Sequence, residues 1–174
     1  MRRVDREQTR DFALQVLDDC NWVTLSMVDP EGQPYAVPIT IAREGLDICV
    51  HCAPEGHKID CLRANPQICI TAVSQAQTDE EHFTVRYASV TGRGTAKEIT
   101  ETEEKIHALR LLCARHAPNN LENMEAMISG ALERAAVWKF TLTDISGKAN
   151  RPLLPNKLQA PMPVLPGAGS HAGR

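Results

Sequence analysis

The residues best suited to chemistry lie in the run His51-Cys52-Ala53-Pro54-Glu55-Gly56-His57-Lys58. The run leads from an expected strand end, through a Pro/Gly turn, into an expected helix. The first N–H groups of a helix lack partners within it and the helix dipole is positive there, so a phosphate is favoured. Lys58 and His57 would add positive charge, and Gly56 would let the backbone approach closely. The run therefore predicts an anion site, although similar turns also occur on ordinary protein surfaces.

Cysteine and histidine also occur together in Cys49-Val50-His51-Cys52, a combination that can hold a metal. Cys49 and Cys52 are three residues apart on an expected strand, so they should face opposite sides and chelate poorly. No second Cys/His pair with zinc spacing follows. We predict no metal site, and His51 is either a hydrogen-bonded residue at a strand end or a group that takes part in chemistry.

The elements that must position this run are mainly strands. Alternating or β-rich segments predict strands at Trp22–Val28, Tyr35–Ile41, Leu46–Cys52, Gln67–Val73, about Thr84–Ile99 and Ala136–Ile145. Helical spacing predicts helices at about Thr9–Asp19, His57–Ala64, from Thr100–Glu103 to Pro118, and Leu121–Ala135. Pro38 cannot donate to a ladder, so its strand should lie at a sheet edge or leave that side free for a ligand. Gly92 and Gly94 predict bends or bulges.

Composition bounds the class of protein. The 174 residues suit one domain, here residues 1–150, and 43% hydrophobic with 24% charged residues is a globular balance. A net charge of -3 gives no reason to expect nucleic acid, and no apolar run is long enough to span a membrane. Without an apolar stretch behind the N-terminus we expect a cytoplasmic protein whose six cysteines are thiols. Residues 151–174 form a Pro-rich tail that could pack on a second subunit.

A longer pattern includes the first run. His51 to Pro66 resembles His-x-Ala-x-x-Gly-Arg/His-Lys followed by Leu-x-x-Asn-Pro, a pattern of flavin-binding split-barrel proteins related to pyridoxamine 5'-phosphate oxidase. The resemblance is closest to the nitroimidazole-resistance (Nim) branch. It extends to Tyr35–Ile39, Tyr87–Gly94 and Ile145–Ala149, and so covers roughly residues 1–150.

The resemblance implies a fold and a cofactor. The fold would be mainly β (α+β): a six-stranded antiparallel split β-barrel with peripheral helices and a helical insertion at about residues 101–135. Two chains would form a homodimer with FMN at the subunit interface.

The resemblance also implies site residues. His57 and Lys58 would contact the phosphate beside Gly56, and His51 and Cys52 would lie against the cofactor. The strand residues Val37, Pro38, Ile39 and Thr40 would run beneath the isoalloxazine. In the Nim branch the histidine that matches His51 is proposed to lie near the substrate, so His51 is the candidate catalytic residue.

Three further residues have two interpretations each. Tyr87 and Ser89 share a strand face and either bond the flavin or form the wetted side of a strand. Lys148 either reaches a phosphate across the dimer or is solvated. The family commonly has arginine at the position of His57, and neutral imidazole is a weaker phosphate ligand than guanidinium.

The resemblance favours an FMN-dependent oxidoreductase that reduces a small oxidised or nitro-aromatic molecule with electrons from NAD(P)H or another donor. The oxidase branch has glutamine where this chain has Tyr87, and its C-terminal substrate-binding segment is not recognisable, so vitamin B6 oxidation is not expected. The alternative is a split-barrel protein that binds haem or a deazaflavin, with or without catalysis. Whether the protein is an enzyme stays open at this point.

Overall fold

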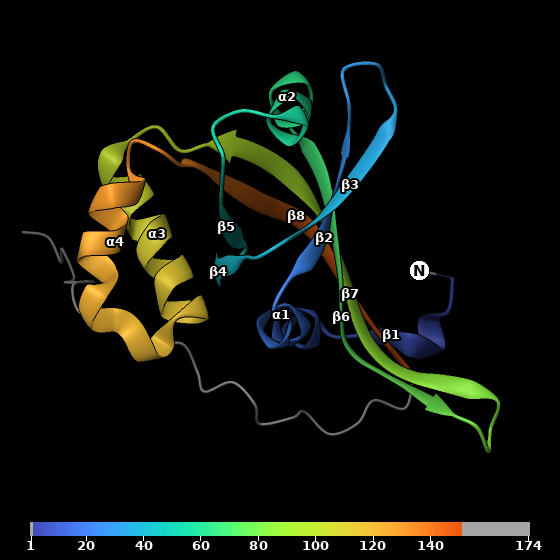
Figure 1. The fold of residues 1–174 in the computed structure, drawn as a ribbon. Helices are drawn as coiled ribbons and strands as arrows, with labels where there is room; N and C mark the ends of the chain where they lie inside the picture. Colours follow the sequence, from blue (N-terminus) through green and yellow to red (C-terminus); the bar gives the residue numbers. More distant parts are fainter. Residues whose placement is uncertain (1, 151–174) are drawn as a thin grey trace, which may run out of the picture.

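The computed structural model describes residues 2–150, which form one antiparallel sheet with helices around it (Figure 1). The strands are β1 (Glu7–Gln8), β2 (Val23–Val28), β3 (Pro34–Ile39), β4 (Ala42–Glu44), β5 (Asp47–Cys52), β6 (Gln67–Asp79), β7 (Thr84–Glu98) and β8 (Ala136–Asn150). The helices are η1 (Val4–Arg6), α1 (Arg10–Asp19), α2 (His57–Ala64), α3 (Thr102–His116), η2 (Pro118–Asn123) and α4 (Met124–Ala131). The Pro-rich segment 151–174 lies outside the described residues. No helix of residues 2–150 is long and apolar enough to cross a membrane.

The sheet has eight strands in the order β3-β2-β6-β7-β8-β5-β4, with β1 added on β8. The mainly antiparallel β fold with helices is confirmed, whereas the structure does not reproduce the predicted count of six strands. One predicted strand, Tyr35–Ile41, ends as β3 at Ile39, and the chain resumes pairing as the separate β4. The other addition, β1, has only two residues and therefore no period that a sequence could reveal.

The β2–β3 hairpin forms at the turn that the sequence predicts. The backbone N–H of Gln33 donates to Asp29 Oδ1 at 2.7 Å, and Gly32 adopts a φ of 83°, which a side chain would disfavour. β3 is the end of the sheet path, so Pro38 lies on an edge strand as expected. The outer backbone edge of β3 is unpaired within the described residues.

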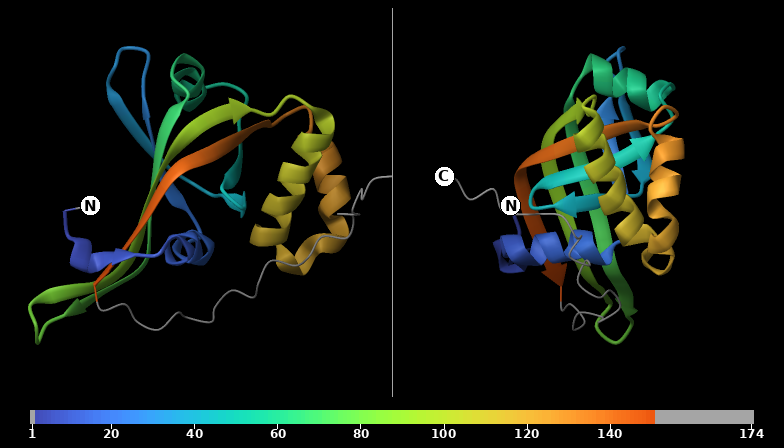
Figure 2. Two further views of the ribbon diagram at one scale, coloured as in Figure 1. Left: turned by 180° about the vertical axis from the view of Figure 1, so that it is seen from behind. Right: turned by 90° about the vertical axis from the view of Figure 1, so that its left-hand side faces the viewer.

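The long strands β6, β7 and β8 bend along their length (Figure 2). The pairing register shifts between Val73 and Gln75, and again between Arg93 and Gly94. A Cβ at Gly94 would lie 2.1 Å from the carbonyl oxygen of Thr141, so β8 approaches there too closely for any side chain. Of the two glycines predicted to mark bends, Gly92 pairs in regular register with Ile70, and only Gly94 lies at a register shift. The strand predicted at Gln67–Val73 continues as β6 to Asp79.

Helices α1, α3 and α4 lie on one side of the long strands (Figure 1; Figure 2, right). α1 places Ala13, Val16 and Leu17 in the main core, with Phe140 among the fully buried side chains. A second cluster joins α3 and α4 to the other face of β4, β5 and β8. Trp138 is buried, whereas Trp22 is 63% exposed. The helical insertion thus covers the strand that carries His51.

A buried arginine attaches the insertion to α1. Arg115, whose side chain is 5% exposed, donates to the carbonyl oxygens of Leu17, Asp18 and Cys20. These carbonyls close the last turn of α1, where backbone acceptors lack helical partners. Burial lowers the pKa of Arg115, and Asp18 opposes that shift. The end of α3 is therefore fixed relative to the core.

On the opposite face of the long strands, α3 packs on the start of β8 at Val137, and no other helix of residues 2–150 covers that face. A row of mostly small polar side chains crosses five strands in register on this outer face: Pro38, Thr24, Thr71, Thr91 and Ser146. Directly opposed residues of antiparallel strands share one face. Val73, 57% exposed, lies on the same face beside Ser89. The described residues leave this face open to a partner or a ligand.

Candidate functional site

The N-terminus of α2 has the geometry of an anion site. Gly56 is its N-cap, with a φ of 122°, and its carbonyl accepts from Ile59 N at 2.8 Å and Asp60 N at 3.1 Å. No side chain of the described residues caps the helix. The N–H groups of His57 and Lys58 are therefore available to an external acceptor, because a helix offers its first N–H groups no partner. A non-glycine residue at position 56 would be strained.

An aromatic contact brings β3 to this helix start. The rings of Tyr35 and His57 meet edge-on, with centroids 4.6 Å apart and planes inclined by 72°. Two segments that sequence reasoning matched separately, Tyr35–Ile39 and the run through Lys58, therefore lie together. Along β3, Val37 packs against the core and Ile39 is buried, so an external ligand could reach them through the free backbone edge. Pro38 and Thr40 are exposed.

The end of β5 completes this first cluster. Cys52 is half-buried and packs on the core; burial raises the pKa of its thiol, and the nearby Lys58 ammonium partly offsets the shift. His51 is exposed on the opposite face of β5, in register with Val137 of β8. Extending the β4–β5 register by two residues beyond Ala42 and Cys49 places Thr40 opposite His51. The structure thus groups β3, the end of β5 and the start of α2.

Sequence reasoning gave His116 no role, yet it touches this cluster. Its Nε2 lies 2.9 Å from the carbonyl oxygen of Ile41, at the break between β3 and β4. That carbonyl can only accept, so Nε2 carries the proton. Burial lowers the pKa of His116, the bond to Ile41 opposes the shift, and Arg115 and His51 lower it further. The contact spans 75 positions in sequence and has no local signal.

A second cluster contains the remaining predicted residues. Ser89 Oγ donates to the carbonyl oxygen of Lys148 at 3.1 Å, and Lys148 Nζ lies 5.8 Å from the centroid of the Tyr87 ring. Arg6, which sequence reasoning missed, donates from Nη1 to the Tyr87 hydroxyl at 3.4 Å. Burial tends to raise the pKa of Tyr87, but bonds from Arg6 and Lys148 prevail and lower it.

One chain does not bring the two clusters together. His51 is opposite Val137, and Lys148 lies eleven residues farther along the same strand, from position 137 to position 148. At about 3.3 Å per residue the separation along β8 is about 35 Å. The α2 helix and the β1 end of the sheet accordingly lie far apart in Figure 1.

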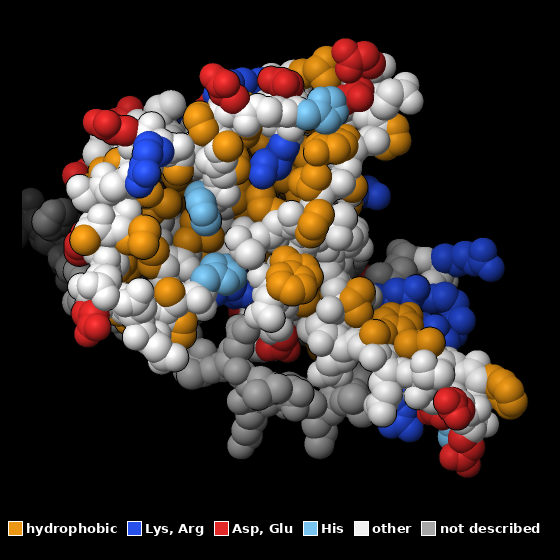
Figure 3. All heavy atoms as spheres, viewed as in Figure 1, with side chains coloured by type: hydrophobic (Ala, Val, Ile, Leu, Met, Phe, Trp, Pro, Cys, Tyr) orange, Lys and Arg blue, Asp and Glu red, His pale blue; other side chains and the backbone are white. Residues whose placement is uncertain are grey.

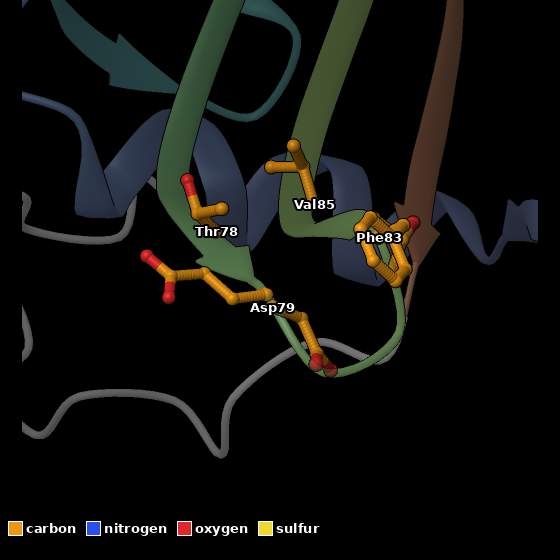
Figure 4. A pocket seen from close by; sticks show the side chains of 6 residues that line it. Thr78, Asp79, Phe83 and Val85 are labelled. Carbon is orange, nitrogen blue, oxygen red and sulfur yellow. The ribbon is translucent and has the colours of Figure 1, made fainter.

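The tip of the β6–β7 hairpin carries a separate hollow of about 410 Å³ (Figure 4). Thr78, Asp79, Phe83 and Val85 line it, with Glu80 and Thr84. Phe83 is 98% exposed and has a φ of 49°. None of the predicted site residues lines this hollow. Among residues 2–150, no group of three or more His, Cys, Asp or Glu side chains could hold a metal ion.

A family model described as pyridoxamine 5'-phosphate oxidase matches residues 9–149. The chain belongs to this family. The family resemblance inferred from the run His51–Pro66 is thereby confirmed. A relative from Rhizobium meliloti (strain 1021), itself uncharacterised, is 32% identical over 108 residues, which make up 58% of this chain and 67% of that protein.

Solved structures share the fold. A candidate 5-nitroimidazole antibiotic resistance protein from Bacteroides thetaiotaomicron is 26% identical, with a TM-score of 0.72 over 82% of this chain and 84% of that chain. A flavocytochrome from Azotobacter vinelandii has a TM-score of 0.74 and 19% identity over 100% of this chain and 88% of its own. An FAD and heme binding protein from Mycobacterium smegmatis has a TM-score of 0.73 and 19% identity, over 87% of this chain and 76% of its own. At 19% identity the last two show the fold alone.

Proposed function

We propose that two copies of this chain bind FMN between them and use it to reduce a small oxidised molecule, nitro-aromatic compounds included. The observation that carries the proposal is the contact between Tyr35 and His57. It places the free edge of β3 against a helix start that suits a phosphate. An elongated ligand with a phosphate at one end and a flat ring system fits this arrangement. When bound, the flavin would supply the two-electron chemistry.

The residues of the first cluster would hold this cofactor. The N–H groups after Gly56 and the Lys58 ammonium would bind the phosphate, assisted by His57. The edge formed by Val37, Pro38, Ile39 and Thr40 would support the ring system, with Cys52 at the end of β5 beside it. Backbone groups of an unpaired edge strand can hydrogen-bond a ring edge without further rearrangement.

The second cluster supports a dimer. Tyr87, Ser89 and Lys148 lie about 35 Å along β8 from the level of His51, so they could complete a flavin site only on another copy of the chain. Between the clusters, no helix of residues 2–150 covers the outer face of β6 and β7, and the small polar side chains there would allow close approach. We infer a homodimer of split-barrel subunits in which each flavin contacts both chains.

His51 is the candidate for chemistry at the ring. Its side chain is exposed, and an imidazole can hold or release a proton near neutral pH. His116 would keep the break at Thr40–Ile41 in place beside it. The electron donor would be NAD(P)H or another reductant. Similarity to the 5-nitroimidazole resistance protein supports the nitro-aromatic substrate class.

Purification tests the proposal directly. We expect a yellow protein with the two visible absorption bands of oxidised flavin, and a mass in solution of twice the 19.2 kDa chain. Extraction and chromatography would identify the released flavin as FMN. A Soret band would instead favour the haem-binding alternative. A colourless protein that also takes up no added FMN would contradict the cofactor assignment.

A further inference from the structure

The β6–β7 hairpin extends past the rest of the sheet as an arm. Asn150, the last residue of β8, pairs with Tyr87, so the arm residues 77–79 and 84–86 pair only with each other within residues 2–150. Figure 2 shows the arm leaving the body of the protein (left). A two-stranded hairpin alone is marginally stable at best in water, so we expect another segment to cover this arm.

The turn of the arm is held so that it presents an aromatic side chain. Asp79 is 8% exposed; its carboxylate accepts from the His82 backbone N–H at 3.3 Å, from His82 Nδ1 at 2.8 Å and from Arg86 Nε at 3.1 Å. Phe83 has a φ of 49°, which is unusual for a bulky residue, and is 98% exposed. Phe83 and Val85 both line the hollow of about 410 Å³ (Figure 4). The turn thus keeps a phenyl ring outside the protein beside an unfilled hollow.

The described part of the chain ends beside this hollow. The Asn150 side-chain amide donates to the carbonyl oxygen of Val85 at 2.7 Å and to the Thr84 hydroxyl at 3.1 Å, and both acceptor residues line the hollow. The next residues in the sequence are Arg151-Pro152-Leu153-Leu154-Pro155. Four residues span up to about 14 Å, whereas Phe83 lies two residues, about 7 Å, beyond Val85 along the arm. The segment therefore begins within reach of Phe83.

The segment after Asn150 also matches the arm in charge and in chemistry. Residues 151–174 include three Lys or Arg residues, five prolines and no Asp or Glu. Acidic side chains gather at the tip of the arm with hydrophobic ones beside them (Figure 3), and within residues 2–150 neither Glu80 nor Glu81 forms an ion pair. Proline-rich sequences bind aromatic surfaces readily, because proline fixes part of their backbone in advance.

We propose that the segment Pro152–Pro155 docks on the arm of its own chain, with Leu154 packed on Phe83 over the hollow. If the β7–β8 register continued beyond Tyr87 and Asn150, Leu154 would be opposite Phe83 on the same face. Pro152 cannot donate to a ladder, so the contact would be made by side chains rather than by a longer strand. The docked segment would stabilise the arm, and this proposal depends neither on the flavin nor on the dimer.

Photocrosslinking of the full chain tests the contact. The exchange Phe83→p-benzoylphenylalanine keeps an aromatic ring at an exposed position and forms a bond to neighbouring C–H groups on irradiation. We expect the crosslink to lie within residues 152–155 by mass spectrometry, and to join parts of one 19.2 kDa chain. The control is Met127→p-benzoylphenylalanine, at a position on α4 that is 63% exposed and should give no crosslink to this segment.

A substitution in the segment tests the same contact without the crosslinker. Leu154→Asp should lower the crosslink yield about tenfold. It should also speed hydrogen exchange of the amides at residues 78–86 about tenfold, because the arm loses a buried leucine contact. Val164→Asp makes the same kind of change ten residues farther along the chain and should leave both measurements unchanged.

Three results would overturn the proposal. One is the absence of any crosslink from position 83 to residues 152–155. Another is a crosslink that joins two chains, which would assign the tip of the arm to a second copy of the protein. The third is equal hydrogen exchange of the arm in the wild type and in the Leu154→Asp variant.

Discussion

The imidazole of His57 meets the ring of Tyr35 edge-on at 4.6 Å, which ties the first residue of α2 to the edge strand β3. Edge-to-face pairs of this kind contribute about 0.5–1.5 kcal/mol beyond their buried area. Tyr35→Ala should therefore release His57 and weaken FMN binding several-fold, whereas Tyr35→Phe keeps the ring and should bind normally. Flavin fluorescence titration measures both. Equal affinity in the alanine variant would separate the contact from the cofactor site.

Lys58 and His57 should change flavin affinity in opposite directions. Lys58→Ala should weaken FMN binding by about 1–3 kcal/mol because a charge-assisted bond to the phosphate is lost. His57→Arg should strengthen binding, since guanidinium presents a permanent charge and two donors. Riboflavin, which lacks the phosphate, serves as the matched ligand. A Lys58 effect of the same size on riboflavin would show that the lysine does not contact phosphate.

His51 should affect turnover without affecting flavin content. His51→Ala should lower kcat for a nitro-aromatic acceptor by about 100-fold if the imidazole transfers a proton. His107→Ala is a suitable control, because the exposed imidazole of His107 hydrogen-bonds Glu44 and takes no part in either cluster. Stopped-flow reduction and reoxidation would locate the slowed step. Unchanged rates would assign His51 a structural role.

Asp79 should make the hairpin arm sensitive to acid. The pKa of the Asp79 carboxyl is lowered to about 2. The hydrogen bond with His82 lowers it most and the bond from Arg86 lowers it further, whereas burial opposes the shift. Because this value is below the unfolded one, the stabilising contribution is complete above about pH 4 and is lost as pH falls toward 2. The difference in unfolding free energy between wild type and Asp79→Asn should shrink over that range. A difference independent of pH would contradict the assignment.

Local signals in the sequence were sufficient for the elements that build the first cluster. The turn after Asp29, the edge position of Pro38 and the start of α2 each depend on residues within a few positions of one another. The continuation of β6 beyond Val73 could not be predicted in this way. Its residues are polar, and they become strand because Thr84–Tyr87 pair with them across the hairpin.

The two residues that sequence reasoning missed make contacts with residues far away along the sequence. Arg6 meets Tyr87 across 81 positions, and His116 meets Ile41 across 75. Neither contact leaves a periodic or motif signature, because each depends on where β1 and α3 finally pack. The division of the site into two clusters also leaves no signature in the sequence, because it follows from the length of β8.

The close approach of Thr141 to Gly94 has a consequence for inherited variation. Any missense change in that codon introduces at least a Cβ, which would lie 2.1 Å from a carbonyl oxygen. The two longest strands would have to separate at their bend, and the ends that carry His51 and Lys148 would shift relative to each other. Glycine at position 94 thus has no permissible substitute, and its codon should tolerate only synonymous change.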